Sequence, residues 1–411
     1  MSINVGTAVG YLDLDTSKFK AGLKDAQSTL SDFTNSSNSA GTRFQALGSS
    51  LKTVGSTITT AVSLPLLALG AGAIKTAADF EAGMSKVAAL SGATGDDLKM
   101  LEEKAKEMGA TTKYSATEAS DALSYMALAG WDAEQMAKGL EPSLKLAGAA
   151  GMDLAQTTDI VTDTMSMFGM EASEATKMTD MLAYAQANSN TDVQQLGEAL
   201  KYCGASANAM GYDLADTTAL LGTFADQGLK GSSAGTTLNA MFRDMKKNAE
   251  EGAIAIGKKK VAIVDANGNY RDMTDILADV QVATEGMTQA ERDMALSSIW
   301  GTEALKGVNM AFEAGVPKIR EFEEGIRSSD GAASEMYDTM QNNLKGAIDN
   351  MKSAFEGVMI TIGERLIPIF QNLVEGITNV LTWFNNLNPA IQNVIIGVGG
   401  FLAILGPLLL I

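Results

Sequence analysis

The stretch "GMDLAQTT" at residues 151–158 returns as "GYDLADTT" at residues 211–218, with six of the eight positions unchanged. In each copy an aspartate, Asp153 or Asp213, follows a glycine and one apolar residue. An aspartate at the N-cap of a helix accepts a hydrogen bond from a backbone N–H two or three residues later, a group that has no carbonyl partner in the first turn. Gln156 also suits the capping-box position of the first copy. We predict that each copy is a joint at which one helix ends and the next begins.

A weaker third copy, "GWDAEQM" at residues 130–136, places Asp132 and Gln135 in the same roles and Trp131 in position to pack against Met136. A glycine precedes each joint, and glycine readily takes the left-handed conformation that closes a helix. The alternative is that the aspartates are metal ligands or paired acids, which requires them to converge in space. Their shared local role explains all three copies, so we favour caps and expect no catalytic, cofactor-binding or metal-binding residues.

The composition restricts the functional classes. The 411 residues carry a formal net charge of −18, which argues against specific nucleic-acid binding because affinity for phosphates depends on Lys and Arg. The sequence has no histidine, the commonest general base and transition-metal ligand. Its one cysteine, Cys203, excludes an internal disulfide, and the apolar surroundings indicate a buried small residue. The first residues lack the pattern of a signal peptide. An enzyme is therefore the least favoured class.

The chain is expected to be mainly α-helical, with short helices joined at Gly and Asp turns. Five parts are predicted from the changes in composition along it. They are a strand, a helix and a linker in 1–42; a helix with an uncharged apolar stretch in 43–75; a helical core in 76–325; an amphipathic helical region in 326–384; and a hydrophobic segment in 385–411.

Inside the core, apolar residues recur at helical spacing. The first helix there is expected to stop at Gly109, and its apolar face consists of Leu98, Leu101, Ala105 and Met108. Methionines such as Met165, Met178 and Met181 are core residues by default, and an adaptable partner-binding surface is the alternative. Asn267 and Gly268, which lie between two apolar runs, predict a β-hairpin at about residues 261–273.

Two stretches resemble ligand-binding loops and fail on inspection. The sequence "GAIAIGKKK", from residue 252, matches a phosphate-binding loop until Lys259 takes the place of the Ser or Thr that binds magnesium. The sequence "DANGN", from residue 265, begins like a calcium loop, but Tyr270 replaces the required glycine and Ile276 the required glutamate. Neither stretch predicts a cofactor or a metal.

Two uncharged stretches raise the question of a membrane. Residues 53–74 are uncharged, but Pro65 and a polar first half leave too short an apolar run to span a bilayer, which favours a buried or partner-facing helix. Residues 394–411 are uncharged and mostly apolar, near the lower limit for a spanning helix. Before them, a long amphipathic helix is expected from about residue 332, with kinks at Gly363 and Pro368. We expect this end to be covered, by further residues of a longer natural chain, by a membrane or by a partner.

With these residues in view, the chain resembles the N-terminal and core region of phage tail tape-measure proteins. The order of several Ala- and Gly-rich stretches, together with the two "DLAxTT" joints, carries the resemblance. These stretches are "LDLDTSKFKAGLKDA" (12–26), "AADFEAGMSKVAALSGAT" (77–94), "ALAGWDAEQM" (127–136), "SSIWGTEALKGVNMAF" (297–312) and "GAASEMYDTMQNNLKGAIDNMKSAFE" (331–356). Members of that family usually run much longer, through extended helical repeats, and that part is missing here.

The resemblance implies a structural protein around which tail-tube subunits polymerise, which sets tail length and is ejected during infection. It implies no enzymatic activity and no cofactor. The implied partners are the tail-tube protein, tail assembly chaperones and baseplate or tail-tip proteins, in the lumen of the tail tube of the virion. Self-association in a few copies and contact with the host membrane also follow as expectations. The competing class is a membrane-active, pore-forming or toxin-like protein.

Overall fold

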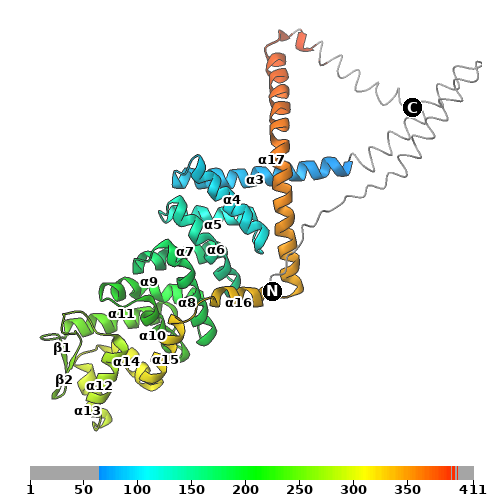
Figure 1. Cartoon of the computed structure of the whole chain (residues 1–411). Helices are drawn as coiled ribbons and strands as arrows, with labels where there is room; N and C mark the ends of the chain where they lie inside the picture. The colour runs from blue at the N-terminus through cyan, green and yellow to red at the C-terminus, as the bar shows by residue number, and fades with distance from the viewer. Residues whose placement is uncertain (1–63, 390, 394–395, 397–411) are drawn as a thin grey trace, which may run out of the picture. The chain divides into compact units, whose positions relative to one another are not determined.

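The computed structural model describes residues 64–389, 391–393 and 396 (Figure 1). By contacts the chain forms two compact units, one of residues 76–361 and one of residues 1–75 with 362–411. The first unit contains the functional features discussed below. The expected N-terminal strand and linker, and most of the hydrophobic segment 385–411, lie outside the described residues.

The described part of the chain is mainly α-helical, as predicted. The helices are α3 (Leu64–Ser91), α4 (Asp96–Thr111), α5 (Ala116–Leu128), α6 (Ala133–Ala150), α7 (Leu154–Phe168), η2 (Ala172–Glu174), α8 (Ala175–Asn188), α9 (Val193–Ala209), α10 (Leu214–Asp226), α11 (Gly231–Lys247), α12 (Met273–Ala283), α13 (Gln289–Ser297), α14 (Thr302–Ala314), α15 (Val316–Arg327), α16 (Ala332–Gln341) and α17 (Leu344–Asn385). The strands are β1 (Ala253–Ile256) and β2 (Lys259–Ala262).

Within residues 76–361, the chain runs out along a row of helices and then returns beside it (Figure 1). From α4 to α11, each helix contacts the next one in sequence. After α14, helix α15 packs against α10 and α8, and α16 packs against α8 and α6. We call residues 316–361 the return segment. It passes the outgoing helices in reverse order, so the unit is held together by contacts between residues far apart in sequence.

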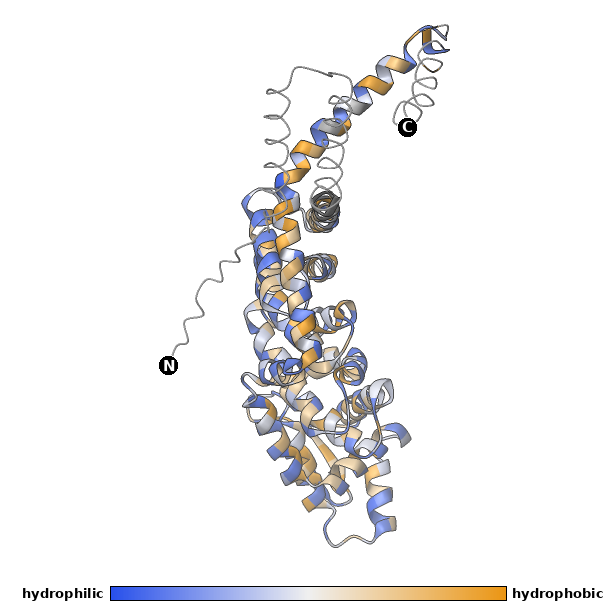
Figure 2. Cartoon of the chain, turned by 90° about the vertical axis from the view of Figure 1, so that its right-hand side faces the viewer, coloured by the Kyte–Doolittle hydropathy of each residue, from blue (hydrophilic) through white to orange (hydrophobic). Residues whose placement is uncertain are grey.

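The interior of this unit consists of two groups of buried apolar side chains. Figure 2 shows the hydrophobic and hydrophilic residues that alternate along its helices. One group lies among α3 to α6 and includes Phe80, Leu123 and, from the return segment, Ile360. The larger group reaches from α6 to α16 around fully buried residues such as Phe224 and Trp300. Burying apolar surface of this extent is the main driving force for the fold. The smaller group includes Ile360 of the return segment, and the larger group includes residues of α14 and of the return segment. These later segments therefore cover apolar side chains of the outgoing helices.

Helices α9 and α11 approach each other closely at Gly235 of α11. A Cβ atom at this position would lie 2.1 Å from the carbonyl oxygen of Ala199 on α9. Any larger residue would force the two helices apart, because interiors are too closely packed to absorb such an overlap. The many small residues of the sequence therefore set the spacing of the row.

The β-hairpin lies earlier than predicted. Its antiparallel strands pair Ala253 with Ala262 and Ile256 with Lys259, so the connection is at Gly257 and Lys258. The expected turn at 267–268 does form, but it closes only an isolated bridge. Alternating burial decides the register, since Ile254, Ile256 and Val261 all point into the core.

Two predictions about helix bounds need correction: the end of α4 and the single long helix after residue 332. Helix α4 does not stop at Gly109 but continues to Thr111, and Thr112 is the C-cap. Gly109 is buried where α4 meets the start of α5. A Cβ atom there would lie 2.7 Å from the backbone nitrogen of Ala116, so this position has no room for a side chain. The long C-terminal helix is divided at residues 342–343 into α16 and α17, and α17 is continuous through Gly363 and Pro368. The apolar face predicted for α4 is confirmed, with Leu101, Ala105 and Met108 buried.

Candidate interaction surfaces and helix joints

The three aspartates predicted as caps are N-caps. Asp132, Asp153 and Asp213 begin α6, α7 and α10, and each carboxylate accepts a hydrogen bond from the backbone N–H three residues later, at 2.9, 3.1 and 3.0 Å. The glycine two residues before each aspartate has a positive φ, between 66° and 85°. The repeated stretch is therefore a joint, as the sequence indicates.

The second half of the capping box forms in two of the three joints. The side chains of Gln135 and Asp216 accept a hydrogen bond from the N-cap N–H at 2.9 and 3.0 Å. The prediction that Gln156 completes a capping box is wrong, because α7 has only the hydrogen bond accepted by the Asp153 side chain. The Gln156 side chain is exposed, where water competes for its hydrogen bonds. Trp131, which lies just before α6, packs its ring over Gly139 of that helix.

The repeated "TT" at the end of the two stretches also has a structural reason, which the sequence reasoning missed. Thr157, Thr158 and Thr217 are buried, and each hydroxyl donates to the carbonyl oxygen four residues earlier at 2.8 Å. This bond satisfies a hydroxyl that would otherwise be costly to bury. Thr218 is also buried, but its hydroxyl has no hydrogen-bond partner among the described residues, so the explanation covers three of the four threonines. The signal available in the sequence was the repetition of the threonines themselves.

Replacing Asp132 or Asp153 with alanine should lower the free energy of unfolding by about 0.5–2 kcal/mol, because one N–H of the first turn loses its acceptor. Asp213→Ala should cost more than either, since Asp213 also pairs with Arg327. Denaturant unfolding of the three variants measures this order. Complete loss of function at native stability, in any of the three, would mean that the aspartate acts as a site and not as a cap.

The buried sulfur-containing residues behave as core residues. Cys203 is fully buried, its thiol donates to the Ala199 carbonyl oxygen at 3.4 Å, and burial raises the pKa of this thiol to about 12. A thiol with this pKa is not a nucleophile at neutral pH. Met165, Met178 and Met181 are all buried, which confirms the core interpretation for these three positions.

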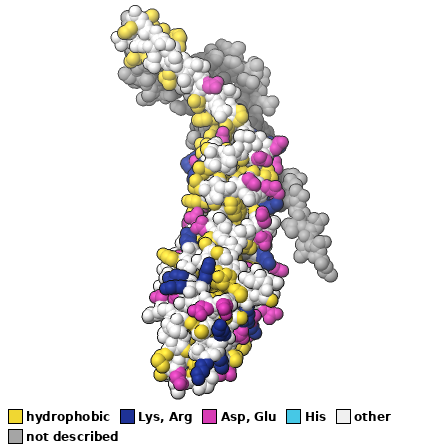
Figure 3. Space-filling model, turned by 90° about the vertical axis from the view of Figure 1, so that its left-hand side faces the viewer, with side chains coloured by type: hydrophobic (Ala, Val, Ile, Leu, Met, Phe, Trp, Pro, Cys, Tyr) yellow, Lys and Arg dark blue, Asp and Glu magenta, His cyan; other side chains and the backbone are white. Residues whose placement is uncertain are grey.

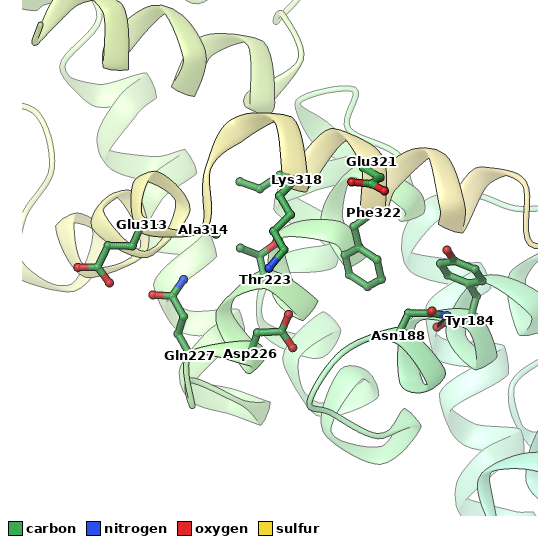
Figure 4. Close-up of a pocket in the computed structure, with 11 residues that line it drawn as sticks. Tyr184, Asn188, Thr223, Asp226, Gln227, Glu313, Ala314, Lys318, Glu321 and Phe322 are labelled. Carbon is green, nitrogen blue, oxygen red and sulfur yellow. Dashed lines mark hydrogen bonds between the residues drawn. The ribbon is translucent and has the colours of Figure 1, made fainter.

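An open pocket of about 600 Å³ lies among α8, α10, α14 and α15 (Figure 4). Lys318 extends into it between the acidic side chains of Asp226 and Glu321 (Figure 4). On one side Phe322 packs over Gly222, where a Cβ would lie 2.4 Å from the ring. We interpret the pocket as a gap along the contact between α15 and its neighbours α8, α10 and α14. Its residues mix both charges and include no nucleophile next to a base.

Helix α17 has a second apolar face that the described structure leaves open. Five of its apolar side chains alternate at spacings of four and three residues and are at least 38% exposed: Leu344, Ile348, Met351, Phe355 and Val358. We call these five residues the apolar face of α17. Spacings of four and three are the a/d pattern of a coiled coil. Ile362 continues the spacing in the sequence.

The opposite face of α17 is docked on the first helices of the row. The Ser353 hydroxyl donates to the Lys113 carbonyl oxygen at 2.7 Å, and the Glu356 carboxylate accepts from the Thr117 hydroxyl at 2.7 Å. Ile360 is fully buried there. Because this face fixes the helix, the apolar face cannot turn inward, and it presents a row of exposed apolar side chains.

On the side shown in Figure 3, acidic side chains lie among the basic ones. Among the described residues, the helices lack an apolar stretch of the length needed to cross a bilayer. Apart from Ile396, the apolar residues 394–411, which the sequence singled out, are outside the described part.

Comparisons with known proteins find sequence relatives among phage tail proteins. Residues 102–301, most of the helical row, match the family model described as "Phage-related minor tail protein". The chain is 36% identical over 409 residues to the "Tape measure protein" of Pneumococcus phage Dp-1, covering 100% of this chain and 35% of that protein. It is 24% identical to the "Probable tape measure protein" of Escherichia phage P2, over 78% of this chain and 41% of that protein. No solved structure matches.

These matches relate the chain first to a class, the phage minor tail proteins. More specifically, over its whole length it is similar to phage tail tape-measure proteins, as its resemblance indicated. It spans little more than a third of the length of the Dp-1 relative. One motif of the resemblance now has a structural role: in "SSIWGTEAL", Trp300 is fully buried and its indole N–H donates to the Met241 carbonyl oxygen at 3.3 Å.

Proposed function

We propose that the chain is a compact helical domain of a tape-measure protein, with a structural role in tail assembly and no catalytic one. The observation that carries this proposal is the match to the Dp-1 tape measure protein over the whole chain. The fold supports it, because the candidate ligand motifs are a hairpin and a turn, and the aspartates are caps. Tail-tube subunits, tail assembly chaperones and baseplate or tail-tip proteins are the partners of this role.

In this role the protein lies in the lumen of the tail tube and leaves it during infection. A phage with an early stop codon in the gene should produce heads and unassembled tube protein, but no tails of defined length. Electron microscopy of the lysate, with and without the gene supplied in trans, measures this. Normal tails in the absence of the protein would overturn the proposal.

The protein associates with further copies of itself through the apolar face of α17. Its five residues follow the a/d spacing of a coiled coil, and a row of exposed apolar side chains is costly in water. The neighbouring Ala347 and Ala354 are small and place no charge against a second helix. A few copies of the chain packed along α17 would bury this face.

The apolar residues 394–411 also support contact with a host membrane after ejection. The full chain should float with liposomes, and a chain ending near residue 380 should not, because the uncharged stretch is removed. Equal flotation of both chains would contradict membrane contact through this segment. It would leave the tail role untouched, since that is tested separately by the stop-codon phage.

A further inference from the structure

A cluster of charged side chains connects the return segment to the second repeated joint. The Arg327 guanidinium, on α15, binds the Asp213 carboxylate through two nitrogens, at 2.5 and 3.1 Å, and also pairs with Asp216 and, at 2.8 Å, with Glu323. Asp272, the N-cap of α12, lies close by, since carboxylate oxygens of Asp216, Asp272 and Glu323 all lie within 4.8 Å of one another. We call these five residues the Arg327 cluster.

The cluster holds more negative charge than its cation can balance. Four carboxylates face one guanidinium, and the nearby Arg320 is already paired with Asp275. The Asp216 and Glu323 side chains are only 14% and 16% exposed, so water screens their repulsion poorly. The Tyr212 phenol also lies within electrostatic range of Asp216 and Asp272. With all four acids ionised, the cluster pushes α15 away from α10 and α12.

One bound proton removes this conflict. Burial, and then the charge of Asp213, raise the pKa of Asp216 to about 7. Burial raises the pKa of Asp272 as well. Burial also opposes ionisation of Asp213, but the hydrogen bonds and the charge of Arg327, together with backbone N–H donors of Asp216 and Ala215, outweigh it and lower the pKa of that carboxyl. The proton therefore belongs on the Asp216 side of the cluster, where it can be shared with Glu323, while Asp213 keeps its charge for Arg327.

We propose that the Arg327 cluster is a proton-controlled latch, which holds the return segment against the joint at 211–216 when it carries one extra proton and loosens it when that proton leaves. The latch lies where α15 meets α10 and α12. Its opening would free α15 first, and α15 leads directly to α16 and to the docked face of α17. The inference does not depend on the tail role.

The direction of the pH effect follows from proton binding. In the closed state Asp216 holds a proton up to about pH 7, whereas an opened Asp216 returns toward its ordinary value of 3.8 and is ionised. Opening therefore releases a proton, so it becomes more favourable as the pH rises. Between about pH 6 and pH 8, opening of α15 should increase several-fold, and at most about tenfold, since partial exposure weakens the effect.

Amide hydrogen exchange of the full chain tests this, with rates expressed as protection factors to remove the chemical pH dependence of exchange. EDTA is present so that a metal ion cannot replace the proton. Protection of α15 should fall as the pH rises, while protection of α5, at the other end of the row, stays constant. In Asp216→Asn, which keeps the size and one acceptor oxygen, α15 should be equally protected at both pH values. The matched control, Asp159→Asn on the exposed side of α7, should behave like the native chain.

Arg327→Gln should lower the protection of α15 at every pH, because the cation that holds the acids together is lost. The proposal fails if protection of α15 is independent of pH in the native chain. It also fails if the pH dependence persists unchanged in Asp216→Asn. Should a variant not fold, the native chain alone decides, since α5 serves as its internal reference.

Discussion

A chain carrying Phe355→Glu should be monomeric at concentrations at which the native chain associates. Phe355 is in the middle of the apolar face of α17 and is 57% exposed, so the substitution removes no buried contact of the single chain. In an associated form, it would place a charge in an apolar seam. Burying one large apolar side chain contributes about 1.5–3 kcal/mol, and each copy supplies one, so we expect the association to weaken by at least about a hundredfold.

Sedimentation or light scattering over a concentration series measures this effect. The matched control is Asn350→Glu, which adds the same charge to an exposed position of the same helix outside the apolar face. It should leave the association unchanged, and both variants should unfold at the temperature of the native chain. A native chain that stays monomeric throughout, or an Asn350→Glu variant that dissociates equally, would contradict association through this face.

The features that the sequence predicted correctly are those determined by neighbouring residues. A cap needs only an aspartate and the N–H groups of the next turn, so Asp132, Asp153 and Asp213 were recognisable from the sequence alone. The same holds for the apolar face of α4, where the periodicity of one helix is sufficient.

The features that the sequence missed depend on distant residues. Gly109 has the composition of a helix end, but it is buried against Ala116, and only the packing of α4 on α5 shows this. The hairpin was placed at the strongest turn signal, whereas burial of Ile254 and Ile256 selected the earlier pairing. Arg327 lies 114 residues from Asp213, so no local pattern could connect them.

We propose that the compact unit of residues 76–361 is a folded domain of a tape-measure protein, and that its helices between residues 76 and 325 are not themselves the ruler. A helical ruler loses about 1.5 Å of tail for each deleted residue, so removing residues 151–168 from such a ruler would shorten the tail by about 27 Å. In the structure this deletion removes α7 with its joint, and α7 packs against α5, α6 and α9. Its loss should therefore unfold the domain and abolish tails.

The direct measurement is tail length by electron microscopy, in phages that carry in-frame deletions of whole helices between residues 76 and 325. Deletions of the same size in helical segments outside these residues, in the protein as the phage encodes it, are the comparison. We expect the first set to give no tails and the second to give tails shortened in proportion to the deletion. Infectious tails shortened by about 27 Å on deletion of residues 151–168 would show that the helical row itself measures the tail.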